Sequence, residues 1–202
     1  TMSPLISALL LAAGSSTRMG QPKALLPLQD QPAILHCLAP LLQGAVKEII
    51  VILGEDSKAA AELLKDMSLK LMFNTLPGSD MVKSVRLGLQ AMHPQATGAL
   101  VCLVDHPLVQ PDTIKQVVAA AMKNPDRIII PTLQGRRGHP SLFPKSLLVE
   151  IYQGFNLRDI IARHPEKVIL LPVEDEGIVL EMDTPADYQK IRGKLEGATH
   201  ER

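Results

Sequence analysis

The chain has 202 residues, of which 46% are hydrophobic and 21% charged, so it can bury a core without metal or disulfide support. Its 21 basic and 21 acidic residues leave no net charge, and only 2% of the residues are aromatic. These numbers exclude an intrinsically disordered chain and disfavour a protein that coats nucleic acid or stacks its bases.

Short apolar runs alternate with longer amphipathic stretches along the chain. Uninterrupted β-branched runs such as Ile49–Ile52 are typical of strands covered on both faces. The first run is rich in Leu and Ala, but a Gly/Ser turn ends it too early for a helix. The predicted strands are Ile6–Ala12, Glu48–Leu53, Lys70–Phe73, Ala99–Val104, Arg127–Ile130, Lys167–Leu171 and Ile178–Met182.

The stretches between these runs carry the apolar spacing of helices. The predicted helices are Ala33–Leu42, Ser57–Met67, Met81–Met92, Pro111–Lys123, Lys145–Tyr152, Leu157–Arg163 and Pro185–Leu195. Strands that alternate with helices predict an α/β fold with a mostly parallel sheet. The glycines and prolines near residues 132–143 predict a small antiparallel excursion, and because no linker divides the chain we expect one domain over residues 1–202.

The apolar segment Leu5–Ala13 is the one stretch that resembles a targeting signal. No basic residue precedes it, as a secretory signal requires, and it is shorter than the ~20 residues of a spanning helix. Cys37 and Cys102 lie within apolar runs, which suits a reducing compartment. We therefore expect a cytoplasmic protein without membrane or nucleic-acid partners.

The loop after the first predicted strand carries the strongest functional signal. Gly14 and Gly20 permit backbone turns whose amides converge on phosphate oxygens, and Arg18 and Lys23 add two positive charges. Five residues separate the glycines where a P-loop has four, and no dinucleotide fingerprint is present. A polar surface turn is the alternative, but the combination favours an anion-binding loop. Its further donors are Ser15, Ser16 and Thr17.

The loop sequence L-A-A-G-S-S-T-R-M-G-Q-P-K resembles the signature of MobA-like nucleotidyltransferases, specifically their molybdenum cofactor cytidylyltransferase (MocA-like) branch. The resemblance implies a Rossmann-like, three-layer fold in which this loop wraps a nucleoside triphosphate. Ala13-Gly14 is similar to the members that use CTP, whereas guanylyltransferases carry Gly-Gly there. The nucleotide-binding residues that it implies are Leu11, Ala12, Ala13, Gly14, Ser15, Ser16, Arg18, Lys23, Asn74, Gly78 and Ser84.

The last three of these residues lie between a predicted strand and a predicted helix. A helix cap with a turn glycine explains the segment without any ligand. In the family this region frames the nucleobase, and its Ser-x-x-x-Gly-Leu pattern is matched from Ser84 to Leu89. The resemblance therefore adds a nucleobase-binding role to Asn74, Gly78 and Ser84.

Two carboxylates follow apolar runs and are the candidates for a magnesium site. Asp105 comes directly after a buried run and has no evident capping role, whereas Asp183 precedes Pro185 and suits helix capping and metal binding equally well. The resemblance supports both, through an Asp-x-Pro and an Asp-Thr-Pro-x-Asp-Tyr pattern. We expect both to bind Mg²⁺, with Arg18, Lys23 and Asp105 as the catalytic residues.

The segment Gly135–Pro140 resembles the Gly-His-Pro segment of the cytidylyltransferase branch, which implies that Arg137, Gly138, His139 and Pro140 line the acceptor pocket. Arginines suit a phosphate-bearing pterin, although a solvated basic loop explains them equally well. His139 has a structural alternative, and we assign no chemistry to His106.

These patterns predict a Mg²⁺-dependent enzyme that transfers CMP from CTP to the phosphate of the molybdenum-bearing pterin and releases pyrophosphate. A client molybdoenzyme is a possible partner. One alternative is a module that binds and delivers the cofactor nucleotide without turnover. A sugar-phosphate or polyol-phosphate nucleotidyltransferase is another alternative, because it shares the first loop. A guanylyl-type nucleotidyltransferase is a third, because the sequence by itself does not select the base.

Overall fold

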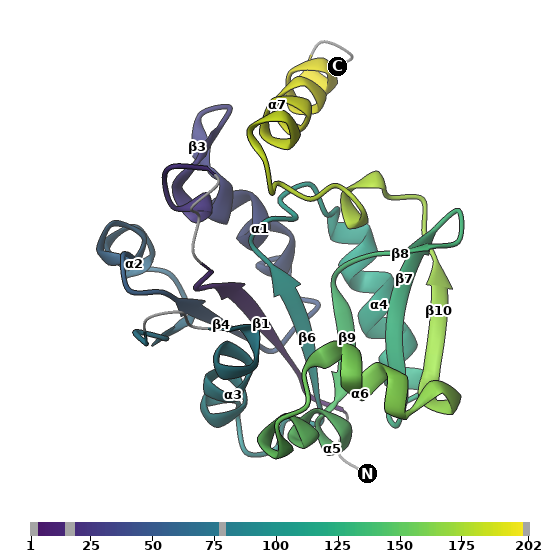
Figure 1. The fold of residues 1–202 in the computed structure, drawn as a ribbon. Coiled ribbons are helices and arrows are strands. Elements are labelled where there is room, and N and C mark those ends of the chain that lie inside the picture. Colours follow the sequence, from purple (N-terminus) through teal and green to yellow (C-terminus); the bar gives the residue numbers. More distant parts are fainter. Residues whose placement is uncertain (1–3, 15–18, 77–79, 200–202) are drawn as a thin grey trace.

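A mixed sheet runs through the centre of the molecule (Figure 1). The computed structural model describes residues 4–14, 19–76 and 80–199. The strands of the sheet are β1 (Ile6–Ala12), β4 (Glu48–Leu53), β5 (Lys70–Phe73), β6 (Gly98–Leu103), β7 (Ile128–Leu133), β8 (Arg136–Arg137), β9 (Ser141–Pro144) and β10 (Val168–Pro172). Their order is β10-β7-β9-β6-β1-β4-β5, and β8 pairs with β7.

Most neighbouring strands in this sheet are parallel. β1 pairs in parallel with β4 and β6, β4 with β5, and β7 with β10. The chain leaves β7, turns at Gly135 with a φ of 80°, and returns as β8. It then forms β9, which lies antiparallel between β6 and β7. The α/β fold with an antiparallel excursion near residues 132–143 is confirmed.

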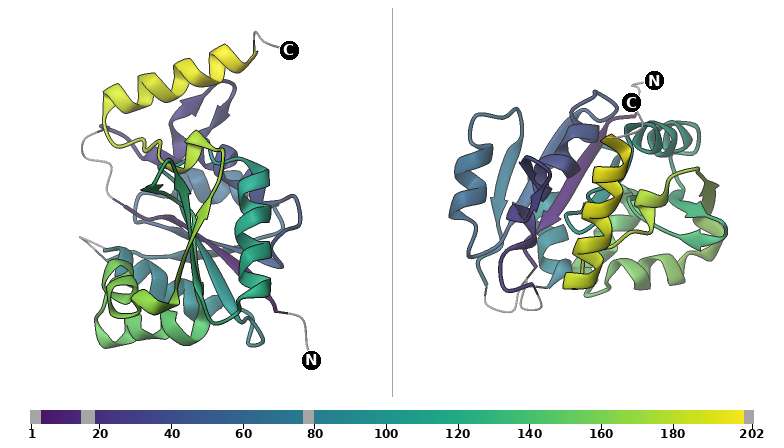
Figure 2. Two further views of the ribbon diagram at one scale, coloured as in Figure 1. Left: turned by 90° about the vertical axis from the view of Figure 1, so that its right-hand side faces the viewer. Right: turned by 90° about the horizontal axis from the view of Figure 1, so that it is seen from above.

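Helices cover both faces of the sheet because its apolar residues alternate between them (Figures 1 and 2). Ala8 and Leu10 face one side with α1, α2 and α4, whereas Leu9 and Leu11 face the other with α3, α5 and α6. No described helix has the length and apolar composition of a membrane span. The helices of these layers are α1 (Ala33–Leu41), α2 (Lys58–Leu64), α3 (Met81–Ala91), α4 (Pro111–Lys123), α5 (Lys145–Leu148) and α6 (Leu157–Arg163).

The C-terminal helix α7 (Pro185–Thr199) lies at one end of the sheet, next to a short hairpin of β2 (Pro27–Leu28) and β3 (Gln31–Pro32) (Figure 2). The sequence analysis did not predict the hairpin, because its two-residue strands carry no periodicity. Leu28, Met182 and Ile191 form a third apolar cluster there. This cluster holds the start of α7, and with it the preceding Asp183, beside the sheet.

Two predicted elements are corrected by the structure. Ile178–Met182, predicted as a strand, pairs with no strand: η4 (Glu176–Ile178) is a 3-10 helix, and the residues after it are irregular. Both end residues are fully buried, so burial rather than pairing explains the apolar run. The predicted helix Lys145–Tyr152 divides into α5 and the 3-10 helix η2 (Val149–Gln153). The other 3-10 helices are η1 (Lys23–Leu25) and η3 (Pro165–Lys167).

Candidate active site

A pocket of about 270 Å³ opens at the carboxyl ends of β1 and β6, next to the start of α3. This is the edge of an open α/β sheet at which ligands bind. The pocket joins the first loop to residues that follow strands far along the sequence. Its lining residues are Leu11, Ala12, Ala13, Gly14, Pro22, Lys23, Ala24, Asp80, Met81, Ser84, Leu103, Val104 and Asp105.

The first loop contributes to this pocket from both of its ends. Leu11–Gly14 line it as β1 ends, and Lys23 lines it as the first residue of η1. Gly20 has a φ of 72°, a conformation that a side chain at this position would disfavour. Ser15, Ser16, Thr17 and Arg18 lie outside the described residues, so their predicted roles remain predictions.

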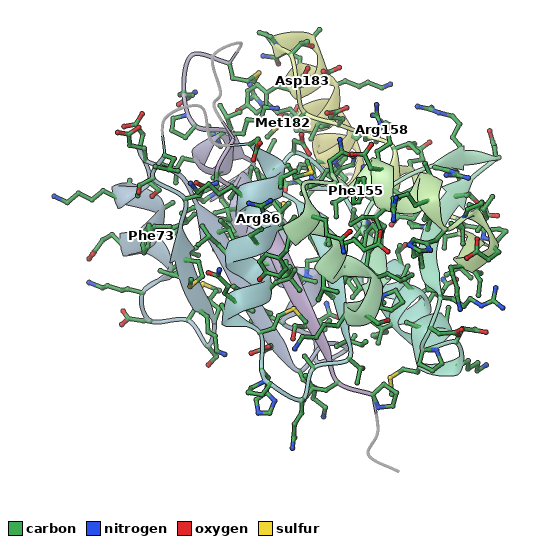
Figure 3. All side chains as sticks on the ribbon, turned by 60° about the horizontal axis from the view of Figure 1, so that its bottom comes forward. Phe73, Arg86, Phe155, Arg158, Met182 and Asp183 are labelled. Carbon is green, nitrogen blue, oxygen red and sulfur yellow. The ribbon has the colours of Figure 1, made fainter. Side chains whose placement is uncertain are left out.

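Lys23 brings the two predicted metal ligands together. Its Nζ lies 3.1 Å from Oδ1 of Asp183 and 3.7 Å from Oδ2 of Asp105. Lys23 and Asp105 expose less than a fifth of their side chains, at 17% and 19%. Figure 3 shows Asp183 next to Met182, where the chain approaches α7. The tertiary fold thus places one ammonium between two carboxylates that are distant in sequence.

The charge of Asp105 is stabilised within this partly buried cluster. Burial by itself would raise the pKa of Asp105, but the hydrogen bond and charge of His106, together with Lys23, hold that pKa below its usual value. Glu181 is a third carboxylate nearby. Its own burial and the negative charges of Asp105 and Asp183 raise the pKa of Glu181. Asp105 is therefore ionised at neutral pH, as a cation ligand must be.

The side chain of Asp183 does not cap α7. Oγ1 of Thr184 accepts a hydrogen bond from the backbone N–H of Asp187 at 3.2 Å, and Oδ2 of Asp187 accepts one from the backbone N–H of Thr184 at 2.8 Å. This reciprocal pair is a capping box. Since Thr184 and Asp187 cap the helix, the carboxylate of Asp183 is directed to Lys23 instead.

The described residues offer two carboxylates, rather than a complete ligand cage, for a metal. No group of three or more His, Cys, Asp or Glu side chains among them is arranged to hold an ion. Magnesium is commonly bound by one or two carboxylates, with substrate phosphates and water as the other ligands. Asp105 and Asp183 are therefore the described residues that could hold a magnesium ion, with phosphate oxygens and water as its other ligands.

The residues predicted to bind the nucleobase differ in whether they reach the pocket. Ser84 lines the pocket, whereas Asn74 is 1% exposed and donates a hydrogen bond from Nδ2 to Oγ of Ser84 at 3.0 Å. Asn74 therefore orients Ser84 from behind. The cap of α3 is Asp80, whose Oδ1 accepts from the backbone N–H of Lys83 at 3.0 Å. Gly78 lies outside the described part of the chain.

The predicted acceptor residues do not line the same pocket. Gly138 and Pro140 are buried, and the backbone N–H of His139 donates to the carbonyl of Ile178 at 2.9 Å. Arg137 is exposed and contributes to a separate groove formed with α6 and β10. Their acceptor role stays a prediction, and the structure brings His139 toward His106 rather than toward Lys23.

The sequence analysis assigned no role to two residues of the site. His106 contacts Asp105 directly, and the charges of Asp105 and Asp183 both raise the pKa of Glu181. His106 could have been selected because it follows the candidate metal ligand in Asp105-His106-Pro107. Glu181 carried no comparable signal, since it was assigned to a strand that does not form.

Comparison with known proteins finds relatives that match most of the chain. Residues 8–168 match the MobA-like NTP transferase domain, and this range includes every residue that lines the pocket, whereas Asp183 lies outside it. The chain is 26% identical over 200 residues to nicotine blue oxidoreductase of Paenarthrobacter nicotinovorans, covering 93% of this chain and 97% of that protein. It is 32% identical over 131 residues to a Rhodopirellula baltica protein named "Probable molybdenum cofactor guanylyltransferase", covering 63% of this chain and 61% of the relative.

A solved structure shares nearly the whole fold. The crystal structure of Rv0371c from Mycobacterium tuberculosis has a TM-score of 0.82 and 27% identity, and the match covers 94% of this chain and 98% of that one. A structure of Rv0371c in complex with manganese has a TM-score of 0.76 and 23% identity, with the same shares of both chains.

Proposed function

The chain belongs to the MobA-like NTP transferase domain family, and from this membership we propose that it transfers CMP from CTP to the phosphate of a molybdenum-bearing pterin. Nucleotidyl transfer is the chemistry of the family. The proposal adds CTP as the nucleotide donor and the phosphate of the pterin as the acceptor. The observation that carries it is one pocket lined by the first loop, Lys23, Ser84 and Asp105.

The choice of CTP depends on the pair Ala13-Gly14, where the guanylyl-type members carry two glycines. Both residues line the pocket, so the side chain of Ala13 lies where a nucleotide would bind. The relative from Rhodopirellula baltica is named a guanylyltransferase, so GTP is the competing nucleotide. Pyrophosphate release with CTP and with GTP therefore distinguishes the two nucleotides.

The reaction requires positioning and charge neutralisation rather than a strong base. An oxygen of the acceptor phosphate attacks the α-phosphorus of CTP, and the bond from that phosphorus to the bridging oxygen breaks. Pyrophosphate leaves with the electron pair. Because the attacking oxygen is already anionic, no proton has to be removed. Lys23 supplies positive charge to the phosphates, and the fixed walls of the pocket align the reactants.

Asp105 and Asp183 would hold the magnesium ion, which when bound neutralises phosphate charge. Manganese in a structure of Rv0371c supports a divalent cation in this fold. Lys23 contacts both carboxylates, so we propose that its ammonium exchanges them for phosphate oxygens as the nucleotide binds. The contribution of Arg18 to the same phosphates remains part of the proposal.

The proposal is tested by pyrophosphate release with CTP, GTP, ATP or UTP, each with Mg²⁺ and the molybdenum-bearing pterin. We expect release with CTP. The Asp105→Ala variant should be at least about a hundredfold slower, because it loses several kcal/mol of transition-state stabilisation. Asp126→Ala is the matched control, since it removes an exposed carboxylate that pairs with Lys167 away from the pocket.

Three outcomes would contradict the proposal in different ways. An Asp105→Ala variant as active as the wild type would remove Asp105 from the chemistry. Tight nucleotide binding, seen as a rise in melting temperature without pyrophosphate release, would indicate a delivery module. Release with GTP but not with CTP would leave the family chemistry intact and refute the base assignment.

A further inference from the structure

A pair of histidines lies directly behind the candidate metal ligand Asp105. Nδ1 of His106 is 2.8 Å from Oδ1 of Asp105, and the His106 residue is only 7% exposed. The His106 and His139 ring centroids lie 4.8 Å apart, with their planes inclined by 62°. Neither histidine lines the 270 Å³ pocket; both line a separate small cavity, together with Leu103 and Pro140.

The backbone that carries Asp105 is anchored on both sides. The backbone N–H of His106 donates to the carbonyl of Leu103 at 3.1 Å, and the backbone N–H of Met182 donates to the carbonyl of Asp105 at 2.7 Å. With the main chain held in this way, the direction of the carboxylate depends on its own side-chain torsions. A hydrogen bond to one oxygen limits those torsions.

His106 and Lys23 approach different oxygens of Asp105. The imidazole takes Oδ1, and Oδ2 lies on the side of Lys23 at 3.7 Å. Since Lys23 and Asp105 both line the pocket, Oδ2 is the oxygen available to a ligand there. The hydrogen bond from His106 therefore fixes Oδ1 of Asp105 and leaves Oδ2 to bind a ligand in the pocket.

The His106 ring is itself supported by a tightly packed segment. A Cβ at Gly138 would lie 2.4 Å from the carbonyl oxygen of Ile178. The backbone at residue 138 therefore lies so close to Ile178 that only glycine fits there. The next residue, His139, donates its backbone N–H to the same carbonyl at 2.9 Å. The ring of His139 thus stands on an anchored backbone and limits the movement of His106.

We propose that His106 is a positioning residue that holds Asp105 with Oδ2 directed at a divalent cation, and that His139 supports His106 from behind. This inference rests on the proposed function of Asp105 as a cation ligand. Groups that hydrogen-bond a ligating side chain are worth about 10–100-fold in metal affinity. The segment Gly138–Pro140 then contributes to the site indirectly, because His139 supports His106 and His106 orients Asp105.

A pair of amide substitutions separates this role from simple core packing. In His106→Asn the side-chain amide reaches the position of Nδ1 and can still donate to Asp105. In His106→Gln the amide reaches the position of Nε2, and the bond is lost. Both side chains are polar and of similar size. Packing alone therefore predicts similar behaviour, whereas the positioning role predicts rescue by asparagine only.

The test measures Mn²⁺ uptake through the loss of the free-ion electron paramagnetic resonance signal, without nucleotide. We expect His106→Gln to weaken Mn²⁺ binding by about 10–100-fold and His106→Asn to stay near the wild type. Asp105→Asn should bind Mn²⁺ least well. The control is His164→Asn, which breaks a bond of the same type, from Nε2 of His164 to Glu150 at 2.6 Å, outside the pocket.

The variants also separate failure of this inference from failure of the proposed function. If Asp105→Asn loses Mn²⁺ while His106→Gln binds it like the wild type, Asp105 is a ligand and His106 does not position it. If Asp105→Asn binds Mn²⁺ as well as the wild type, or if no Mn²⁺ is taken up even when Lys23→Met removes the competing ammonium, the cation site and this inference are both overturned. Melting temperatures of all variants show that each one is folded.

Discussion

Replacement of Gly177 by alanine should destabilise the folded chain. The segment between β10 and α7 passes the residues after β6 at backbone contact distance. A Cβ at Gly177 would lie 2.2 Å from the carbonyl oxygen of Leu108, 2.4 Å from its carbonyl carbon and 2.7 Å from the amide nitrogen of Val109. All three are backbone atoms, so no side-chain rotation relieves the contact.

The expected cost follows from the contacts and from a hydrogen bond at the same residue. Overpacking typically costs about 1–3 kcal/mol. The backbone N–H of Gly177 also donates at 2.8 Å to Asp175, whose carboxylate accepts from the backbone N–H of Gln110 and from the hydroxyl of Thr113. Straining this buried network adds about 1 kcal/mol or more. We expect a total loss of about 2–4 kcal/mol, or a melting temperature lower by about 5–15 °C.

Urea unfolding and differential scanning calorimetry measure this loss. The matched control is Gly193→Ala in α7, where a Cβ meets nothing within 4 Å. Because alanine is a better helix former, the control should gain up to about 1 kcal/mol. If Gly177→Ala stays within about 0.5 kcal/mol of the wild type, the range of an ordinary surface change, the close packing of this segment is refuted.

Three further perturbations have expected outcomes. Lys23→Met should tighten Mn²⁺ binding measured without nucleotide, because the ammonium no longer competes for Asp105 and Asp183, and should slow pyrophosphate release about a hundredfold. Weaker Mn²⁺ binding by this variant would contradict the competition. Asp187→Ala should lose about 1 kcal/mol of unfolding free energy with the capping box, whereas Asp187→Asn keeps an acceptor and should lose less. Equal losses in the two variants would argue against the cap. Burial lowers the pKa of His139 to about 4. Below about pH 6.5 the imidazole of His139 is therefore protonated in the unfolded chain but stays neutral in the folded chain. The free energy of unfolding should therefore fall by up to about 3 kcal/mol between pH 6.5 and pH 4. Urea unfolding of His139→Leu should show a weaker dependence of that free energy on pH.

Local patterns in the sequence were sufficient for the main framework. The apolar runs of β1 and β4 are buried on both faces, and such strands can be recognised from composition and length alone. Asp105 follows β6, so its place at the pocket edge depends only on a strand end and on the rule for parallel sheets. The fold class and this part of the candidate site are therefore properties of short segments.

Long-range contacts decided the rest, because burial has the same sequence signature whether or not a segment pairs with the sheet. Ile178 and Met182 are fully buried although their segment pairs with no strand, and no periodicity distinguishes such a segment from a strand. Asp183 and Lys23 are 160 residues apart, and their contact exists only after α7 has docked. Tertiary packing decides which partner a side chain finds: Thr184 and Asp187 form the cap of α7, and Asp183 pairs with Lys23 instead.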